Sequence, residues 1–274
     1  MSQLPDPAAL VQGTGLPNRS HLQRVLVSEL ARLGGLPAAW TPSQQALAGP
    51  GPFEAALRQD VTTRGGAVIA EYKQASPSLG PFALGTPLLA QLQAYAEGGA
   101  SAFSILAEPA YFKGTAEHLR MAADFGLPRL YKGFVISAVQ LAEAEAVGAE
   151  AVLLIARVLK QHTAAFAEAA RARGLEPLVE LHDLTEVGFA QAAEARLVGI
   201  NARDLATFNL GAPTAEPLRQ AFPEALLIRE SGLATPEAAR AALRAGFDAV
   251  LIGEALMRSA DPRDFLHRIL TGIR

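Results

Sequence analysis

From residue 67 onward, short apolar runs alternate with amphipathic segments, and this repeated order constrains the fold more than any other feature of the chain. The starts of the runs lie roughly 20 to 35 residues apart, which leaves room for one helix and two loops each time. Most runs lack period-two alternation, as is typical of parallel strands covered on both faces. We predict strands at residues 67–73, 101–106, 129–134, 151–155, 177–182, 197–201, 225–230 and 249–253.

Helical patterns fill the intervals between these runs. Residues 86–97 place apolar side chains about 3.6 positions apart, residues 137–146 start at the N-cap candidate Ser137, and residues 235–245 start with the capping sequence TPEAA. Eight successive βα units predict an α/β fold, the (β/α)8 TIM barrel, which occupies about 250 residues as a single domain. An open doubly wound sheet is the alternative, but no GxGxxG follows the first predicted strand.

Residues 1–66 do not follow this alternation. They contain a predicted helix at residues 20–33, a Pro/Gly-rich stretch, and a short predicted helix at residues 52–60. This segment is too poor in apolar residues for a core of its own. We therefore predict one structural domain, in which an N-terminal helical extension (1–66) packs on a barrel formed by residues 67–274.

Charge and composition exclude several classes of function. The net charge of −3 gives no electrostatic footprint for nucleic acid or an anionic membrane. The absence of cysteine excludes disulfides, thiolate catalysis and cysteine-based metal sites. The first residues, MSQLPDPAALVQG, lack the pattern of a secretory signal, and no run of about 18 apolar residues occurs. We expect a cytoplasmic protein, monomeric or weakly homo-oligomeric, that binds neither nucleic acid nor membrane.

Lysine is scarce in this chain and occurs at two predicted strand ends. There are 4 lysines among the 24 basic Lys and Arg residues. Lys73 ends the run AVIAEYK, and Lys132 ends PRLYK. A desolvated lysine can lose or donate a proton, whereas arginine stays charged. The two lysines therefore indicate acid–base or anion chemistry.

Other polar residues also follow predicted strands. In a TIM barrel the chemistry lies at the carboxyl ends of the strands. Glu71 and Lys73 are two residues apart and share a face of their strand, and paired opposite charges in a dry site can provide an acid and a base at neutral pH. The alternative is that these residues form ion pairs that merely plug the barrel end. The candidates are Glu71, Lys73, Ser104, Lys132, Glu180, Asn201, Arg203, Glu230 and Ser231.

The last two predicted strands end in glycine turns, ESGL and IGEA. In TIM barrels the loops after strands seven and eight commonly bind phosphate through backbone N–H groups and a helix N-terminus. Gly232 and Gly253 permit close backbone approach, and Ser76 and Ser78 could add hydroxyl groups. These turns predict a phosphate site.

The histidines do not indicate a metal centre. No HxH or HExxH pattern occurs. We interpret His182, next to Glu180, as a structural hydrogen-bonding residue. The remaining histidines stand in helix-like contexts and are predicted to lie on the surface: His21, His118, His162 and His267.

An ordered set of motifs over about residues 50–270 resembles the indole-3-glycerol phosphate synthase family of tryptophan biosynthesis. The resemblance implies a carboxy-lyase that closes the ring of 1-(2-carboxyphenylamino)-1-deoxyribulose 5-phosphate with loss of carbon dioxide and water. It also implies no cofactor, with this small phosphosugar–anthranilate compound as the substrate. The motifs are AEYKQASPSLG, SAFSILAEPAYFKG, LPRLYKGF, AVLLIARVL, LVELHD, VGINARDLATF, ESGLATPEAA and LIGEALMRSADP.

The same resemblance implies a role for each candidate. Lys132 would be the general acid, Glu180 the general base, and Lys73 the anchor of the substrate carboxylate. Condensation onto a ketone develops negative charge on oxygen, which a positioned ammonium can protonate. The sugar hydroxyls would meet Glu71, Asn201 and Glu230, supported by Arg203. The phosphate would meet Ser76, Ser231, Gly232, Gly253 and Glu254. Leu106, Phe112 and Phe134 would form an apolar wall for the aromatic ring, unless they only pack the core.

Two positions depart from the family's motifs. The usual KDF reads KGF, so Gly133 stands where an aspartate is expected, and the usual INNRD reads INARD, with Ala202. The missing acid next to Lys132 puts the rate of turnover in question. The alternatives are therefore a phosphosugar-binding paralogue with reduced or lost turnover, or another phosphosugar barrel of the isomerase type.

Overall fold

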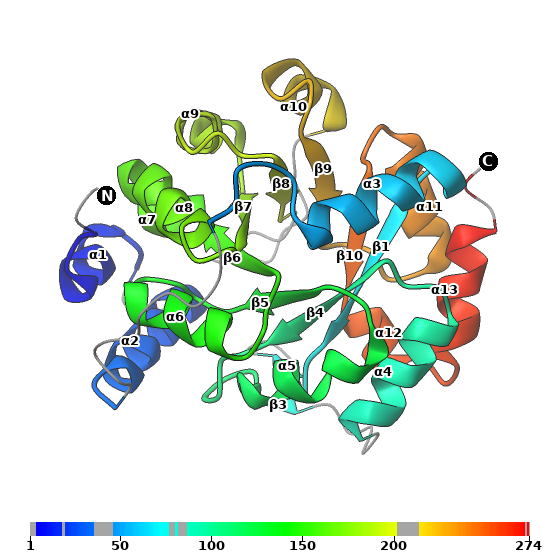
Figure 1. Cartoon of the computed structure of the whole chain (residues 1–274), viewed down its shortest axis with the longest axis horizontal. Helices are drawn as coiled ribbons and strands as arrows, with labels where there is room; N and C mark the ends of the chain where they lie inside the picture. The colour runs from blue at the N-terminus through cyan, green and yellow to red at the C-terminus, as the bar shows by residue number, and fades with distance from the viewer. Residues whose placement is uncertain are drawn as a thin grey trace.

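Eight parallel strands close into a barrel in the computed structural model (Figure 1), which describes residues 4–17, 20–35, 46–76, 80–81, 87–201, 214–271 and 273. The first barrel strand pairs with both the second and the last, so the sheet has no edge. The predicted (β/α)8 barrel is confirmed, and the open doubly wound alternative is wrong. The strands are β1 (Ala67–Tyr72), β4 (Ala102–Leu106), β5 (Arg129–Lys132), β6 (Ala151–Ile155), β7 (Glu176–Leu181), β8 (Leu197–Ile200), β9 (Leu226–Arg229) and β10 (Ala249–Ile252).

The strands are buried along almost their whole length, as parallel strands between a packed interior and a helical layer should be. Only the last residues of β5 and β9, Lys132 and Arg229, are partly exposed. Every predicted strand is present, and its ends lie within two residues of the predicted ones. The differences fall where the chain leaves the ladder for a loop, so the polar residues stand at or just beyond the strand ends.

Helices surround the barrel (Figure 1). The predicted caps are confirmed: Ser137 accepts a hydrogen bond from the backbone N–H of Val139, and Thr235 accepts one from Ala238. The helix predicted from residue 86 begins at Leu88, and residue 86 lies outside the described residues. The outer helices are α4 (Leu88–Glu97), α5 (Glu117–Met121), α6 (Ala138–Ala146), α8 (Thr163–Arg171), α9 (Val187–Ala192), α10 (Ala215–Ala221), α11 (Pro236–Arg244) and α13 (Pro262–Leu270).

Several short elements were not predicted. They sit in the loops at the strand ends or between strand and helix, where hydrophobic periodicity is too short to give a signal. They are the antiparallel pair β2 (Ala75–Ser76) and β3 (Gly80–Pro81), the helices α7 (Ala156–Leu159) and α12 (Glu254–Arg258), and the 3-10 turns η1 (Ala123–Phe125), η2 (Lys160–His162) and η3 (Leu184–Glu186).

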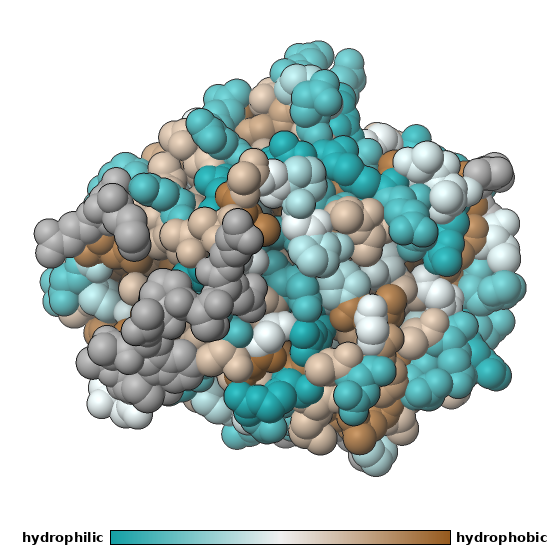
Figure 2. Space-filling model, in the orientation of Figure 1, coloured by the Kyte–Doolittle hydropathy of each residue, from teal (hydrophilic) through white to brown (hydrophobic). Residues whose placement is uncertain are grey.

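Apolar side chains on the outer surface are scattered. The face in Figure 2 is mainly hydrophilic over α10, at the top of the view. The large apolar side chains that are exposed among the described residues, Val27, Leu89, Met121 and Leu184, lie on different elements. Within the described ranges, no helix combines the length and hydropathy needed to cross a bilayer.

The N-terminal segment contributes three helices, α1 (Pro7–Gly13), α2 (His21–Leu33) and α3 (Pro52–Arg64). The first was not predicted, and the third extends beyond the predicted residues 52–60. Figure 1 places α1 and α2 beside α6 and α7. Buried residues of all three helices belong to the same apolar core as the strands. These contacts support the assignment of one structural domain, which stays a prediction.

Helix α3 is anchored at the amino-terminal end of the barrel by a carboxylate. Its first turn has no side-chain cap of its own. Instead, the buried Glu176 of β7 accepts hydrogen bonds from the backbone N–H groups of Gly51, Phe53 and Glu54, at 3.1, 2.6 and 2.9 Å. The carboxylate thus satisfies three donors that a helix N-terminus leaves unpaired. Phe53 and Leu57 of the same helix are fully buried.

We expect Glu176→Ala to lower the free energy of unfolding by about 3–5 kcal/mol, because it leaves several buried N–H groups without an acceptor. Urea titration followed by circular dichroism measures the loss. Glu176→Gln keeps one acceptor oxygen and should lose less, and Glu224→Ala, at an exposed site, should lose almost nothing. Equal stability of Glu176→Ala and the parent would contradict this anchoring role.

Candidate active site

A cavity of about 700 Å³ lies at the carboxyl-terminal end of the barrel. Of the predicted site residues that the structure describes, all but Ser104 line it: Glu71, Lys73, Ser76, Leu106, Phe112, Lys132, Phe134, Glu180, Asn201, Glu230, Ser231, Gly232, Gly253 and Glu254. Arg203, Ala202 and Ser78 lie outside the described residues. Side chains that are far apart in the sequence therefore lie together, as their positions at the strand ends predicted. Their roles stay predictions.

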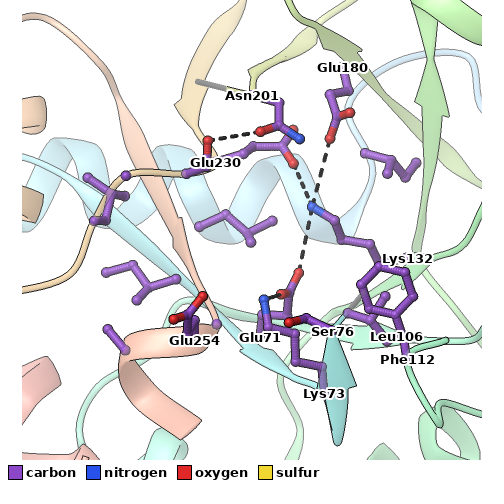
Figure 3. A pocket seen from close by; sticks show the side chains of 18 of the residues that line it. Glu71, Lys73, Ser76, Leu106, Phe112, Lys132, Glu180, Asn201, Glu230 and Glu254 are labelled. Atoms are coloured by element: carbon purple, nitrogen blue, oxygen red, sulfur yellow. Dashed lines mark hydrogen bonds and ion pairs between the residues drawn. The ribbon is translucent and has the colours of Figure 1, made fainter. Parts of the chain in front are cut away.

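The ammonium of Lys132 lies among three carboxylates (Figure 3). Its Nζ donates a hydrogen bond to Glu230 Oε2 at 2.6 Å and lies 3.6 Å from Glu71 Oε2 and 3.9 Å from Glu180 Oε2. The three glutamates come from β1, β7 and the end of β9. Only 14% of the Lys132 side chain is exposed, and the glutamate side chains are nearly completely buried. The charges therefore interact in a largely dry environment.

Lys73 pairs with Glu71 from the same strand, as their spacing predicted. Lys73 Nζ lies 2.8 Å from Glu71 Oε1, while the other carboxylate oxygen, Oε2, accepts a hydrogen bond from Ser104 Oγ at 3.3 Å. Glu71 thus has a contact with both lysines. Ser104 is buried beneath the cavity and does not line it.

Asn201 connects two other strand ends. Its Oδ1 accepts a hydrogen bond from Ser231 Oγ at 2.8 Å, and its side chain hydrogen-bonds to Glu180. The amide therefore orients a carboxylate beside Lys132 and the hydroxyl that precedes the turn at Gly232. That glycine has a φ of 79°, in the left-handed region that favours glycine.

Burial and the uneven number of charges set the protonation of the cluster. Burial raises the pKa of Glu180 and raises that of Glu230 to about 8, although Lys132 opposes both shifts. Burial also works against the charge on Lys132, but attraction to Glu230, Glu71 and Glu180 outweighs it and raises the pKa of Lys132. Burial tends to raise the pKa of Glu71 too, but Lys73 and Lys132 prevail and lower it.

One retained proton accounts for this pattern. Lys73 and Lys132 supply two positive charges against three carboxylates, so one negative charge is in excess in a dry site. Among the described residues, the buried Oε1 of Glu230 has no donor when both carboxyls are ionised. A proton on Glu230, whose pKa burial raises to about 8, removes the excess charge and gives this carboxyl a donor of its own.

Two glycines make room for the carboxylates. A Cβ at Gly199 would lie 1.8 Å from Glu230 Oε1, and one at Gly253 would lie 2.3 Å from Glu71 Oε1 and 3.0 Å from Lys73 Nζ. The carboxylates therefore lie directly against the backbone of a neighbouring strand. For Gly253, which was predicted only as part of a phosphate turn, this contact is an additional reason for glycine.

Aromatic side chains form one wall of the cavity. The rings of Phe112 and Phe134 lie 5.7 Å apart at an interplanar angle of 32°. The loop that carries Phe112 is held by the buried carboxylate of Glu108, which accepts hydrogen bonds from the backbone N–H groups of residues 110, 111 and 112 at 3.0, 2.8 and 3.0 Å. An aromatic substrate ring would fit against this wall.

Several residues that line the cavity were not predicted from the sequence. Leu153 and Ile155 point inward from β6, and period-two spacing could have identified them. Arg258 follows Glu254 by one helical turn, with its Nε 3.5 Å from the Glu254 carboxylate. His21 comes from α2, and no sequence signal connects that helix with the barrel mouth. The full set is His21, Gly133, Leu153, Ile155, Leu233, Ala234, Leu251, Ile252, Ala255, Arg258, Ser259 and Phe265.

The predictions for the histidines need correction. His21, His118 and His162 are half-buried rather than on the surface, because helices that pack against the barrel present one face inward; His267 is exposed as predicted. The ring nitrogens of the buried His182 make no hydrogen bond among the described residues, so the expected structural hydrogen bond is wrong. They lie 3.5 Å from a Glu180 oxygen and 3.8 Å from a Glu186 oxygen instead. Within the same ranges, no group of three or more acidic or histidine side chains is arranged to hold a metal.

Comparison with known proteins identifies relatives of the whole barrel. The family model described as indole-3-glycerol phosphate synthase matches residues 41–269. The indole-3-glycerol phosphate synthase of Lactiplantibacillus plantarum is 40% identical over 225 residues, covering 81% of this chain and 85% of that protein. Indole-3-glycerol phosphate synthase 2 of Streptomyces coelicolor is 42% identical over 243 residues, covering 88% and 90%.

A solved structure of a protein with a different name shares the fold. The thiamine phosphate pyrophosphorylase of Pyrococcus furiosus superposes with a TM-score of 0.52 at 17% sequence identity, covering 74% of this chain and 93% of that chain. A likeness at this identity concerns the barrel alone, because unrelated activities share this fold.

The raised pKa of Glu230 predicts how stability depends on pH. Since the carboxyl titrates at about 8 in the folded chain against an ordinary value of 4.5, the folded state holds a proton that the unfolded state has released between these values. The contribution of Glu230 to stability is complete below the lower value and falls with rising pH by about 1.4 kcal/mol per pH unit.

Glu230→Gln imitates the protonated carboxyl. It should reduce the slope of the unfolding free energy against pH by the amount that corresponds to about one proton. Urea unfolding at several pH values across the window measures both slopes, and the exposed Glu224→Gln serves as the control. If Glu230→Gln and the parent had the same slope, the retained proton would not reside on Glu230.

Proposed function

The chain belongs to the indole-3-glycerol phosphate synthase family, and we propose that its charged cluster carries out the family's ring closure. The substrate is 1-(2-carboxyphenylamino)-1-deoxyribulose 5-phosphate, and the products are indole-3-glycerol phosphate, carbon dioxide and water. This is the reaction of a carboxy-lyase in tryptophan biosynthesis. The observation that carries the proposal is the Lys132 ammonium, held among Glu230, Glu71 and Glu180 inside a cavity of about 700 Å³.

Binding uses opposite ends of the substrate. The phosphate meets the turns at Gly232 and Gly253, with Ser76, Ser231 and the backbone of Glu254 nearby. The benzoate ring lies against Phe112, Phe134 and Leu106, and Lys73 holds its carboxylate. Glu71, Glu230 and Asn201 bind the hydroxyls between these ends. The role of Arg203 in supporting them stays a prediction.

The first chemical step is the formation of the carbon–carbon bond. The ring carbon that bears the carboxylate attacks the ketone carbon, and Lys132 gives a proton to the ketone oxygen, which becomes a hydroxyl. Carbon dioxide then leaves with its bonding electrons returned to the ring, which restores aromaticity. The high pKa of Lys132, which attraction to its three glutamates maintains against burial, keeps this acid protonated at neutral pH.

Dehydration converts the closed five-membered ring into the indole. The hydroxyl leaves as water with a proton from an ammonium, and Glu180 removes a proton from the adjacent carbon next to the nitrogen. Burial raises the pKa of Glu180, so its carboxylate is a stronger base than an exposed one. Proton removal and loss of hydroxide form the carbon–carbon double bond, and atoms and charge balance.

A steady-state assay of the purified chain, following the fluorescence of indole-3-glycerol phosphate, tests the proposal. We expect product formation that increases in proportion to enzyme concentration. Binding of a substrate analogue with no product above background would overturn it and favour a paralogue without turnover. Location in the cytoplasm and a monomeric or weakly oligomeric state stay predictions.

Lys132→Ala should lower kcat by about 10²–10⁴-fold, the usual contribution of a general acid. Lys132→Arg should be nearly as slow, because a guanidinium keeps the charge but does not give up its proton. Lys113→Ala, at an exposed lysine, is the matched control and should retain the parent rate. A Lys132→Ala enzyme within a few-fold of the parent would show that another group is the acid.

A further inference from the structure

Gly133 follows Lys132 directly, and the ring of Tyr131 explains why glycine stands there. A Cβ at position 133 would lie 2.6 Å from Tyr131 Cε1, closer than a real Cβ contact. The φ angle of Gly133 is not in the left-handed region, so its backbone conformation does not require glycine. Space is the constraint: the residue after Lys132 can carry no side chain while the Tyr131 ring stays in place.

Tyr131 has little freedom to give way. Its side chain is fully buried, and it projects to the opposite side of β5 from Lys132, because successive residues of a strand alternate. Its hydroxyl donates a hydrogen bond to Glu143 Oε2 of α6 at 2.6 Å. Burial and the nearby Glu143 raise the pKa of Tyr131, so the hydroxyl keeps its proton and remains a donor.

Helix α2 is connected to this tyrosine through one arginine. Arg32 Nη1 donates to Glu143 Oε1 at 3.0 Å, and Arg32 Nη2 donates to Glu29 Oε2 at 2.9 Å. The planar guanidinium can bridge two carboxylates in fixed directions, which a lysine cannot do. Glu29 is almost fully buried, and the Arg32 and Glu143 side chains are 20% and 14% exposed, so the bridge is largely but not completely shielded from water.

Hydrogen bonds also connect Glu29 to the backbone that follows Gly133. Gln140 Nε2 donates to Glu29 Oε2 at 2.7 Å and to the backbone carbonyl of Phe134 at 2.9 Å. Gln140 Oε1 accepts from the backbone N–H of Ile136 at 2.8 Å. We call this closed set the α2 bridge: Tyr131, Glu143, Arg32, Glu29 and Gln140.

The α2 bridge therefore holds residues 131 and 134, which flank Lys132 and Gly133, against the N-terminal helix. Lys132 must stay 2.6 Å from Glu230, and its strand ends at that residue. Lys132 still pairs with Leu106 of β4, but the pairing of β5 with β6 stops at Tyr131. A shift of about 1 Å can cost a hundredfold in rate. The backbone that follows the acid needs a second support, and the bridge supplies it through Gln140.

We propose that Tyr131 is a positioning residue for Lys132, acting by its ring over Gly133 and by the α2 bridge. This inference rests on the role given to Lys132 in the proposed function. It makes the N-terminal helix part of the machinery that places the acid, although α2 supplies no acid of its own. It also accounts for glycine at the position where the family's motif has aspartate.

Tyr131→Phe tests the hydrogen-bonded part, because it removes the hydroxyl and leaves the ring. We expect kcat to fall about tenfold while KM changes less than about threefold, since an interaction that matters only in the transition state affects kcat. Arg32→Lys should give a similar split. Tyr111→Phe, in the loop before Phe112, is the matched control.

The four lysines of the chain allow a readout that does not depend on turnover. In protein labelled with ¹³C at lysine Cε, the signal missing from Lys132→Arg identifies Lys132. We expect this signal to move in Tyr131→Phe but not in Tyr111→Phe. An unmoved signal together with an unchanged kcat would overturn the positioning role.

A double-mutant cycle tests the steric part. Gly133→Ala should lower the melting temperature, because its methyl group meets the buried ring. In a Tyr131→Leu background the same substitution should lower it by less than half as much. Equal decreases in both backgrounds would show that the ring does not determine Gly133. If the parent had no turnover, the proposed function would fail, while the melting cycle and lysine signals would still decide this inference.

Discussion

Attraction between one ammonium and three buried carboxylates is the interaction on which the barrel mouth depends. Lys132 stands among Glu71, Glu180 and Glu230, which come from three other strands. Without the cation, three carboxylates would face one another in a dry site, where an unpaired charge costs several kcal/mol. The arrangement also needs a closed barrel, because only closure brings β1 beside β10, and it needs Gly199 and Gly253, against which two of the carboxylates lie.

Strand β7 carries a buried glutamate at each end of the barrel, and the two carboxylates have different roles. At the amino-terminal end, Glu176 is surrounded by backbone donors and fixes α3. At the carboxyl-terminal end, Glu180, four residues later on the same strand, lies 3.9 Å from the ammonium of Lys132. Burial raises the pKa of both carboxyls, so their partners make the difference. Backbone donors surround Glu176, which serves stability, whereas Glu180 faces an ammonium in an open cavity and is suitable for chemistry.

The barrel and most of its mouth could be predicted from the sequence, because both follow from local rules. Alternating runs located the strands, and the strand ends located Glu71, Lys132, Glu180 and Glu230. The contributions of the N-terminal segment could not be predicted. Arg32 meets Glu143 across 111 residues, and a helical histidine such as His21 carries no signal that it will reach a cavity. Gly133 was interpreted as a lost acid, since the ring that excludes a side chain there is visible only in three dimensions.

The anchoring of α3 has a consequence for the order in which the chain can fold. The backbone of Phe53 and the carboxylate of Glu176 are 123 residues apart in sequence, so their contact closes a long loop and carries the entropy cost of doing so. On the ribosome, α3 emerges well before β7 is synthesised. Phe53 and Leu57 are fully buried in the complete barrel. Until β7 is available, they must remain exposed to water or make transient contacts with other apolar groups. The amino-terminal end of the barrel thus contains a helix from the first part of the chain. The contact between this helix and β7 can form only after more than half of the chain has been translated.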